Sequence, residues 1–561
     1  MTKGLAELIS VAKGETPADL LLANARVINV FSGEIEAGNV AIYGERIAGV
    51  GNYRQAKKIL DLGGKYIAPG LINGHIHPES SMLDIGQYAR AVVPHGTTAL
   101  VTDLHEIANV CGVEGIKYVL EYARRLPFDL FLMAPSCVPA THLETSGASL
   151  DAEDIRQLLK LKEVIGLGEV MNFPGVLDGD EAVLKKISLA EGKIIDGHAP
   201  GVSGKNLSAY IAAGIYSDHE SVSLDEAKEK LKQGMWAMLR EGSAEKNLEA
   251  LLPLVTDKTY SRCLFVVDDR SCLDLLKDGD IDAVVRRAIG LGLEPVRAIQ
   301  LATINTAQYF RRGGLGAVAP GYMANLLVLS DLPRLQIEMV FYRGGIVAQE
   351  GKPLFPLPQA TGRGLTDTVN IKPFNIEALR LSAPGEAMPI IEVVPGQIIT
   401  RKRMEKIKAT NGMVTPDISR DILKLVVVER HKATGNIGVG LVSGFGLKRG
   451  ALASSIAHDS HNIIAVGTSD EDIFTAVKEI ERLQGGLVAT AQGKVLASLA
   501  LPIAGILSDE PLEAVVSKLE GLERIAAGLG TKLTSPFATL SFLALPVIPE
   551  IRLTDRGVVE L

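Results

Sequence analysis

The chain has 561 residues, of which 47% are hydrophobic and 22% are charged, and its formal net charge at pH 7 is −8. A chain of this length can form two or three domains with buried cores. Because an acidic chain has no net positive surface for phosphates, we exclude nucleic acid and anionic membranes as main partners and expect a small-molecule ligand.

The N-terminal residues and the cysteines indicate a cytoplasmic protein. Charged Glu7, Lys13 and Glu15 interrupt the first apolar residues, which is unlike a signal peptide. No run of about 18 apolar residues predicts a transmembrane helix. The four cysteines have no CxxC spacing, so we expect reduced, packed thiols instead of disulfides or a zinc site.

Residues 20–68 contain short β-rich runs separated by glycine-containing turns. The runs at 25–30, 40–43 and 46–50 contain Val and Ile. This pattern predicts a small antiparallel sheet.

From residue 71 onward, apolar strand-like runs alternate with longer amphipathic segments, which is typical of repeated strand–helix units. The runs are 71–77, 97–103, 130–136, 164–170, 193–198, 215–219, 236–240 and 263–268, with helices expected at 115–126, 152–162, 224–233 and 244–254. Eight strands favour a closed (β/α)8 TIM-type barrel. An open doubly wound sheet is the alternative, although no GxGxxG turn follows the first strand.

Polar residues gather at the ends of these runs, where barrel enzymes place catalysis. His75 and His77 end the first run and share one face of the strand, so they can hold a metal ion together. The metal-ligand candidates are His75, His77, Glu169, His198, His219 and Asp268. A two-metal site needs about this many ligands and one bridging carboxylate, for which Glu169 is the natural candidate.

Each candidate also has a purely structural interpretation. A His-x-His pair can arise by chance, and a single histidine near an apolar strand is usually a hydrogen-bonded core residue. Asp268 and Asp269 could cap a following helix. Glu169 is harder to explain in this way, because an uncompensated buried carboxylate loses several kcal/mol of hydration. The joint placement at five strand ends favours a metal site.

Longer motifs carry a resemblance to a known family. The run 69–77, Pro-Gly-Leu-Ile-Asn-Gly-His-Ile-His, resembles the amidohydrolase superfamily, and its continuation Pro-Glu-Ser-Ser-Met at 78–82 resembles the adenine deaminase family within it. Further similar segments are 94–98, 103–110, 136–140, 196–201, 218–220, 240–243, 268–270, 444–447 and 457–462. The resemblance implies hydrolysis of adenine to hypoxanthine and ammonia at a binuclear Mn, Fe or Zn centre, with Mn favoured, in a homodimer or larger assembly.

The sequence departs from the family pattern at a few positions. Asn73 stands where Asp is commoner, Pro78 where an aliphatic residue is usual, and Val267 where Thr is frequent. None of these changes removes a proposed ligand, although they could alter ligand orientation. Other superfamily members bridge the metals with a carbamylated lysine, whereas the matching position here is Glu169.

The remaining polar residues near the strand ends are candidates for catalysis and substrate binding. Asp268 is expected to transfer a proton from the attacking water. The other catalytic candidates are Glu79, His105 and Glu106, and the substrate-binding candidates are Glu220, Glu241 and Asp269. Several of these residues could instead support the ligands or lie in solvated loops. His95 and His142 are weaker candidates.

The predicted domains follow from these patterns and the resemblance. Residues 1–68 are the first part of a small composite β-sandwich domain, 69–312 form the barrel, 313–372 return to the β domain and include a linker at 355–372, and 373–561 form a C-terminal α/β domain. In the last region we expect strands at 423–428, 463–466 and 486–490 and a helix at 470–483. The spacing of His458 and His461 fits a metal, a substrate lid or hydrogen-bonded loop residues, and we do not assign them as ligands.

Two other functions stay open. The same metal core could hydrolyse a cyclic amide or another aminated heterocycle, because the residues that read the substrate are poorly determined. A barrel of this kind could also be a non-catalytic scaffold, but the presence of every ligand candidate argues against it.

Overall fold

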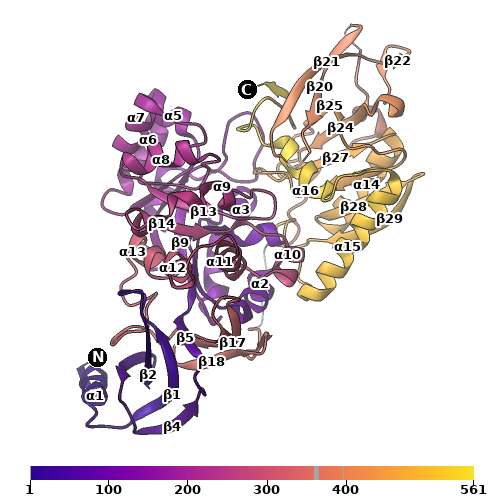
Figure 1. Ribbon diagram of the computed structural model, residues 1–561. Coiled ribbons are helices and arrows are strands. Elements are labelled where there is room, and N and C mark those ends of the chain that lie inside the picture. The colour runs from indigo at the N-terminus through magenta and orange to yellow at the C-terminus, as the bar shows by residue number, and fades with distance from the viewer. Residues whose placement is uncertain (1, 359–364, 384, 396, 561) are drawn as a thin grey trace.

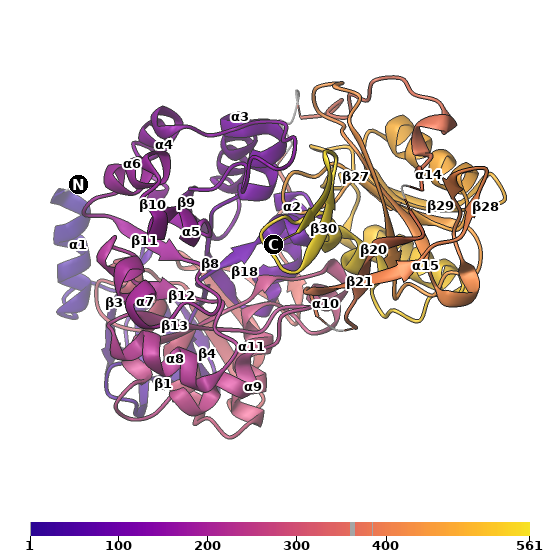
Figure 2. The ribbon, with the colours of Figure 1, turned by 90° about the horizontal axis from the view of Figure 1, so that it is seen from above.

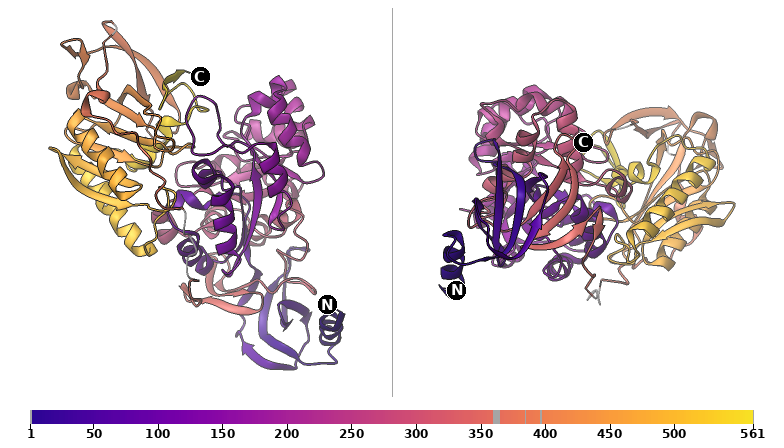
Figure 3. Two further views of the ribbon diagram at one scale, coloured as in Figure 1. Left: turned by 180° about the vertical axis from the view of Figure 1, so that it is seen from behind. Right: turned by 60° about the horizontal axis from the view of Figure 1, so that its bottom comes forward.

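The computed structural model describes residues 2–358, 365–383, 385–395 and 397–560. Figure 1 shows a sheet domain, a central barrel and a C-terminal domain. The views in Figures 2 and 3 agree that the sheet domain and the C-terminal domain lie against different parts of the barrel. The predicted linker at 355–372 includes residues 359–364, which lie outside the described residues.

The sheet domain is built from segments on both sides of the barrel sequence. Its elements are α1 (Thr2–Ala12), β1 (Ala18–Ile28), β2 (Ile35–Tyr43), β3 (Arg46–Gly51), β4 (Ala56–Asp61), β5 (Tyr66–Pro69), β16 (Leu326–Asp331), β17 (Gln336–Tyr342), β18 (Gly345–Gln349) and β19 (Lys352–Pro353). β16 pairs with β5, so the strands after the barrel extend the sheet that begins before it.

One prediction for this domain is wrong in detail. The sheet is mixed and not antiparallel, because β4 and β5 both pair in parallel with β1. β4 pairs with the first part of β1 and β5 with the last part. The turn residues in the sequence do not reveal with which strand, or in which direction, a strand pairs. Within the described residues the strands form one continuous sheet, and β3 and β17, which are far apart in it, share a core that includes Val27, Ile47 and Phe341. The composite β-sandwich stays a prediction.

The barrel is a ring of parallel strands. They are β6 (Leu71–Asn73), β7 (Ile76–His77), β8 (Thr97–Thr102), β9 (Asp129–Pro135), β10 (Val164–Val170), β11 (Ile194–Gly197), β12 (Ser217–Asp218), β13 (Trp236–Arg240), β14 (Cys263–Val266) and β15 (Asp268–Asp269). Parallel pairing links β6 through β8, β9 and β10 to β11, and β12 through β13 to β14. β11 contacts β12, and β15 pairs with β7. This closure confirms the predicted TIM-type α/β fold.

Helices surround the strands. They are α2 (Ile85–Val92), α3 (His105–Ala123), α4 (Ala152–Leu158), α5 (Phe173–Asp178), α6 (Glu181–Leu189), α7 (Gly204–Ala212), α8 (Leu224–Lys232), α9 (Leu248–Leu251), α10 (Cys272–Lys277), α11 (Ile281–Gly290), α12 (Pro295–Leu301) and α13 (Ile304–Tyr309). α3 begins at His105 and not near the predicted residue 115. Gly112, with a φ of 60°, separates its buried first turns from the amphipathic part that the sequence reveals.

Close packing of β10 against β11 brings functional candidates together. β10 is buried along its whole length, as is typical of parallel strands covered on both faces. A side chain at Gly166 would place its Cβ 2.3 Å from the Ile194 carbonyl oxygen, so only glycine permits this strand spacing. Glu169 on β10 therefore lies beside His198, which follows β11.

The C-terminal domain is an α/β sheet. Its elements are β20 (Ala387–Val393), β21 (Thr400–Lys406), β22 (Ala409–Thr410), β23 (Met413–Val414), β24 (Leu423–Val428), β25 (Ile437–Ser443), β26 (Ala451–Ser454), β27 (Ile463–Gly467), α14 (Asp470–Leu483), β28 (Gly486–Ala491), β29 (Lys494–Ala500), α15 (Leu512–Leu529), α16 (Pro536–Ser541), β30 (Ile551–Thr554) and β31 (Gly557–Glu560). The predicted strand at 423–428 and helix at 470–483 are confirmed. α14 packs on one face of the sheet, and the other face shares a core with α15 and the barrel.

Hydrogen bonds join this domain to the barrel. The Ser508 N–H donates to the Met82 carbonyl at 2.8 Å, and the Asn462 side chain donates to the Thr145 carbonyl at 2.8 Å. Asp555 accepts from both the N–H and the hydroxyl of Thr145.

None of the helices in the described part of the chain is long and apolar enough to span a membrane. The four cysteines are free.

A buried ion pair holds together the ends of β11 and β12. Lys230 donates to the Asp218 carboxylate at 2.9 Å and to the Ala199 carbonyl at 2.7 Å, and both Lys230 and Asp218 are buried. The other oxygen of Asp218 accepts from the Ala199 N–H at 3.0 Å. The pair thus connects Ala199, directly after His198, with Asp218, directly before His219.

Replacing Lys230 by methionine should strongly destabilise the barrel. Lys230→Met leaves the Asp218 carboxylate buried without its cation, and we expect the free energy of unfolding to fall by about 3–5 kcal/mol. Urea unfolding followed by the fluorescence of Trp236, the single tryptophan, measures this change in the barrel. The control is Lys117→Met, which removes an exposed pair with Glu114 and should change stability by less than about 0.5 kcal/mol. Equal unfolding midpoints for the two variants would contradict this account.

Candidate metal centre

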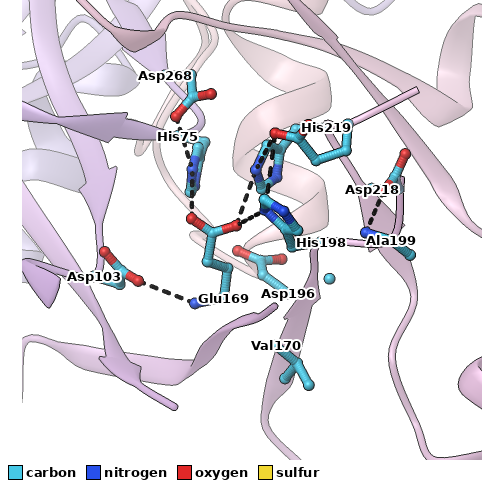
Figure 4. A network of polar contacts seen from close by, with 12 residues as sticks. His75, Asp103, Glu169, Val170, Asp196, His198, Ala199, Asp218, His219 and Asp268 are labelled. Atoms are coloured by element: carbon cyan, nitrogen blue, oxygen red, sulfur yellow. Dashed lines mark hydrogen bonds and ion pairs between the residues drawn. The ribbon is translucent and has the colours of Figure 1, made fainter. Parts of the chain in front are cut away.

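The side chains predicted at the strand ends meet in one cluster. His75 lies between β6 and β7, and His77 is the last residue of β7. Glu169 lies on β10 and Asp268 on β15. His198 directly follows β11 and His219 directly follows β12. Figure 4 shows Glu169 between His75 on one side and His198 and His219 on the other.

The two carboxylate oxygens of Glu169 face different histidines. Oε1 lies 3.8 Å from His75 Nε2 and 3.5 Å from His77 Nε2. Oε2 lies 2.5 Å from His198 Nδ1 and 3.0 Å from His219 Nε2. One carboxylate therefore connects two groups of imidazole nitrogens.

Asp268 faces the same cluster from the opposite side. Its Oδ1 lies 3.5 Å from His75 Nε2 and 3.2 Å from His77 Nε2. Its Oδ2 accepts a hydrogen bond of 2.7 Å from Arg240 Nη1, which fixes the rotation of the carboxylate. The φ of Asp268 is 68°, an unusual conformation for a residue other than glycine and one that occurs at functional positions.

Burial and charge together determine the ionisation of this cluster. Burial alone would raise the pKa of Glu169, but His219 and His198 lower this pKa well below its ordinary value, so the carboxylate is anionic. Burial and the neighbouring His219 lower the pKa of His75, which favours its neutral, ligating form. Although burial opposes the change, Glu169 raises the pKa of His198 and raises that of His219 to about 9, so a divalent cation would bind here by displacing the protons of these histidines.

The cluster fits a divalent cation. Atoms of His75, His77 and Glu169 lie within 4.8 Å of one another, as do atoms of His75, His219 and Asp268 and atoms of Glu169, His198 and His219. The buried His75 Nε2 has no hydrogen-bond partner among the described residues, and it points at the two carboxylates. A bound cation would satisfy this nitrogen.

Asp103, which follows β8, supports the cluster from behind. It accepts from the Glu169 N–H at 3.0 Å and from His105 Nδ1 at 2.9 Å, and it lies 3.3 Å from His77 Nδ1. A carboxylate on the far nitrogen of a ligating histidine fixes the ring orientation. Sequence reasoning did not single out Asp103, although its position directly after a barrel strand is the same signal that identified the histidines.

The three further catalytic candidates lie beside the cluster and are buried. Glu79 accepts from the Ile107 N–H at 3.4 Å, and its Oε2 has no hydrogen-bond partner within the described ranges. Burial raises the pKa of Glu79 to about 7. His105 Nε2 lies 3.5 Å from Glu106 Oε1, so these neighbours on α3 face each other.

The substrate-binding candidates separate into two groups. Glu220 lies 3.5 Å from His219 Nε2 and is held by Arg240, and Asp269 accepts from the Ser80 hydroxyl, so both border the cluster. Glu241 instead accepts from the Leu248 N–H at 3.3 Å and pairs with Arg287 at 2.9 Å. These contacts connect Glu241 to α9 and α11 and not to the ligand candidates.

The remaining histidines have varied surroundings. His95 precedes β8, at the barrel end opposite the cluster, and contacts Asp282 at 3.0 Å. His142 is exposed. His458 and His461 of the C-terminal domain both contact Glu106, which brings this domain to the candidate site.

Comparisons with known proteins agree across the whole chain. The family model for the amidohydrolase family matches residues 66–347, and that for the adenine deaminase C-terminal domain matches residues 397–561. An adenine deaminase of Dehalococcoides mccartyi is 63% identical over 560 residues, covering 100% of this chain and 98% of the relative. Adenine deaminase 2 of Carboxydothermus hydrogenoformans is 50% identical, covering 100% and 98%. The adenine deaminase of Clostridium acetobutylicum is 47% identical, covering 99% and 98%.

Replacing Asp103 by asparagine should lower the affinity for metal, although every ligand candidate stays in place. In Asp103→Asn an amide nitrogen replaces one accepting oxygen, so either His105 or the Glu169 N–H loses its partner. We expect a 10- to 100-fold weaker affinity for divalent metal, measured by competition with a chromogenic chelator. The control is Asp282→Asn, a buried aspartate paired with His95 outside the cluster, whose metal affinity should equal that of the wild type. Wild-type affinity in Asp103→Asn would show that Asp103 does not support the ligands.

Proposed function

Because the chain belongs to the adenine deaminase family of the amidohydrolases, we propose that it hydrolyses adenine to hypoxanthine and ammonia at two divalent metal ions held around Glu169. The membership makes the chain a hydrolase that acts on adenine. The residues and the metals that perform the reaction are inferred from the geometry of the cluster.

The orientation of Glu169 carries the proposal of two metals. Its Oε1 faces His75 and His77, and its Oε2 faces His198 and His219. We assign one metal to the first pair together with Asp268, and the other metal to the second pair. A carboxylate with one oxygen toward each group is suited to bridging ions about 3.5–4 Å apart.

Bound divalent cations would make a water molecule acidic enough to attack C6 of adenine near neutral pH. Asp268 is the proposed proton carrier. Arg240 holds its Oδ2, which leaves Oδ1 directed at the cluster. Oδ1 can accept the proton of the attacking water and deliver it to the departing amine.

Buried polar groups around the cluster are proposed to contact the purine ring. The ring of His105 lies 4.5 Å from that of His77, Glu106 contacts His105, and Glu79 is buried two residues after His77. These three residues are the candidates for stabilising charge on the ring during attack. Glu220, which lies 3.5 Å from His219 Nε2, and Asp269, which pairs with His77 between β15 and β7, are candidates for hydrogen bonds to the ring edge. Glu241 is omitted because Arg287 and the Leu248 N–H occupy its carboxylate.

An ammonia-release assay tests the activity. Metal-free protein is reconstituted with Mn²⁺, our first choice, and in parallel with Fe²⁺ and Zn²⁺, since histidine and carboxylate ligands suit all three ions. Adenine, adenosine, cytosine and a hydantoin are then supplied as substrates. We expect ammonia from adenine only. Opening of the hydantoin without ammonia from adenine would favour the alternative, a cyclic-amide hydrolase.

The bridging role of Glu169 has its own test. Glu169→Gln keeps the size of the side chain but removes its charge, so we expect metal content to fall from about two ions per chain to below one and activity to fall with it. Elemental analysis and ammonia release measure the two quantities. Glu241→Gln is the matched control and should keep its metal. Full metal content and activity in Glu169→Gln would remove Glu169 from the site.

Other features stay predictions from the sequence. These are a role in purine salvage, a cytoplasmic location and a homodimer or larger assembly. A non-catalytic scaffold is disfavoured because the ligand candidates lie together and face one another.

A further inference from the structure

Glu106 of the barrel is held by the C-terminal domain. His458 Nδ1 donates to Glu106 Oε1 at 2.6 Å, and His461 Nε2 contacts Glu106 Oε2. All three side chains are buried. The two histidines lie in the segment 457–462, which connects β26 to β27, and they engage one carboxylate oxygen each.

This segment is fixed in place from several directions. The ring of His458 stacks on Phe542 with 4.5 Å between centroids and 15° between planes, and the backbone N–H of His458 donates to the Ser541 carbonyl at 3.0 Å. The guanidinium of the fully buried Arg430 donates to the His461 carbonyl. The histidines therefore form a rigid surface against which Glu106 packs.

The contacts determine the orientation of Glu106. A buried carboxylate needs compensating hydrogen bonds, because leaving it unpaired costs several kcal/mol. Within the barrel His105 provides one contact, at 3.5 Å. The shorter contacts come from the other domain, and contacts to both oxygens fix the rotation of the carboxylate as well as its position.

We propose that His458 and His461 are positioning residues of the active site, which hold the Glu106 carboxylate toward the bound purine. The barrel then carries the metals, but its substrate pocket is complete only when the segment 457–462 is docked. This inference rests on the proposed adenine deaminase activity and on the role proposed there for Glu106.

The test compares variants that remove or keep the donor in the full-length, metal-loaded enzyme. His458→Asn keeps an N–H near the position of Nδ1, and His461→Gln keeps one near the position of Nε2, whereas the alanine variants keep neither. We expect kcat/KM for adenine to fall 10- to 100-fold in His458→Ala and His461→Ala, with much of this loss restored in the amide variants and with unchanged metal content.

A double-mutant cycle shows whether the histidines act through Glu106. In a Glu106→Ala background, His458→Ala should change kcat/KM by less than about twofold, because residues that act as one unit are not additive. The control is His95→Asn, which changes a half-buried histidine that contacts the buried Asp282 outside the site, and its kcat/KM should equal that of the wild type.

The outcomes separate the two proposals. If the wild type releases no ammonia from adenine, the proposed function fails. If the wild type is active but both alanine variants keep full kcat/KM, or if the His458→Ala loss persists in the Glu106→Ala background, the positioning role fails alone. Should an alanine variant not fold, the amide variants decide, because a positioning role requires them to be more active than Glu106→Ala.

Discussion

The buried carboxylate of Glu169 is the constraint on which the barrel site depends. It is 4% exposed, and a carboxylate in such surroundings is stable only if positive or metal-bound groups compensate its charge. The strand β10 pairs with β9 on one side and with β11 on the other, so compensation has to come from the ends of other barrel strands. This requirement explains why histidines stand at the ends of strands on both sides of Glu169.

Charged residues outside the cluster hold its members in place by hydrogen bonds. Asp103 holds the backbone of Glu169 and the ring of His105, and Arg240 holds Asp268. Asp103 and Arg240 thus each hold a residue of the site by a hydrogen bond, and these bonds limit the rotation of His105 and Asp268. Pre-organisation of this kind positions ligands and proton carriers before substrate arrives.

Much of the fold and of the candidate site could be predicted, because barrel strands show as apolar runs and the polar residues that end them meet at one face. This reasoning placed His198 and His219 beside Glu169. It failed for Glu241, which also ends a strand but faces a helix, since sequence position does not determine the direction of a side chain after the last strand residue. The contact of His458 with Glu106 spans 352 residues, and no local pattern reveals a contact of that kind.

The same long-range contact has a consequence for the newly made chain. Domains fold as units while the ribosome extends the chain from its N-terminus. The barrel strands are complete by residue 269, whereas the segment around His458 is made almost 200 residues later. During that interval Glu106 lacks its contacts with His458 and His461, whereas every strand that carries a ligand candidate has already been made. The order of synthesis thus favours assembly of the ligand candidates first and orientation of Glu106 second.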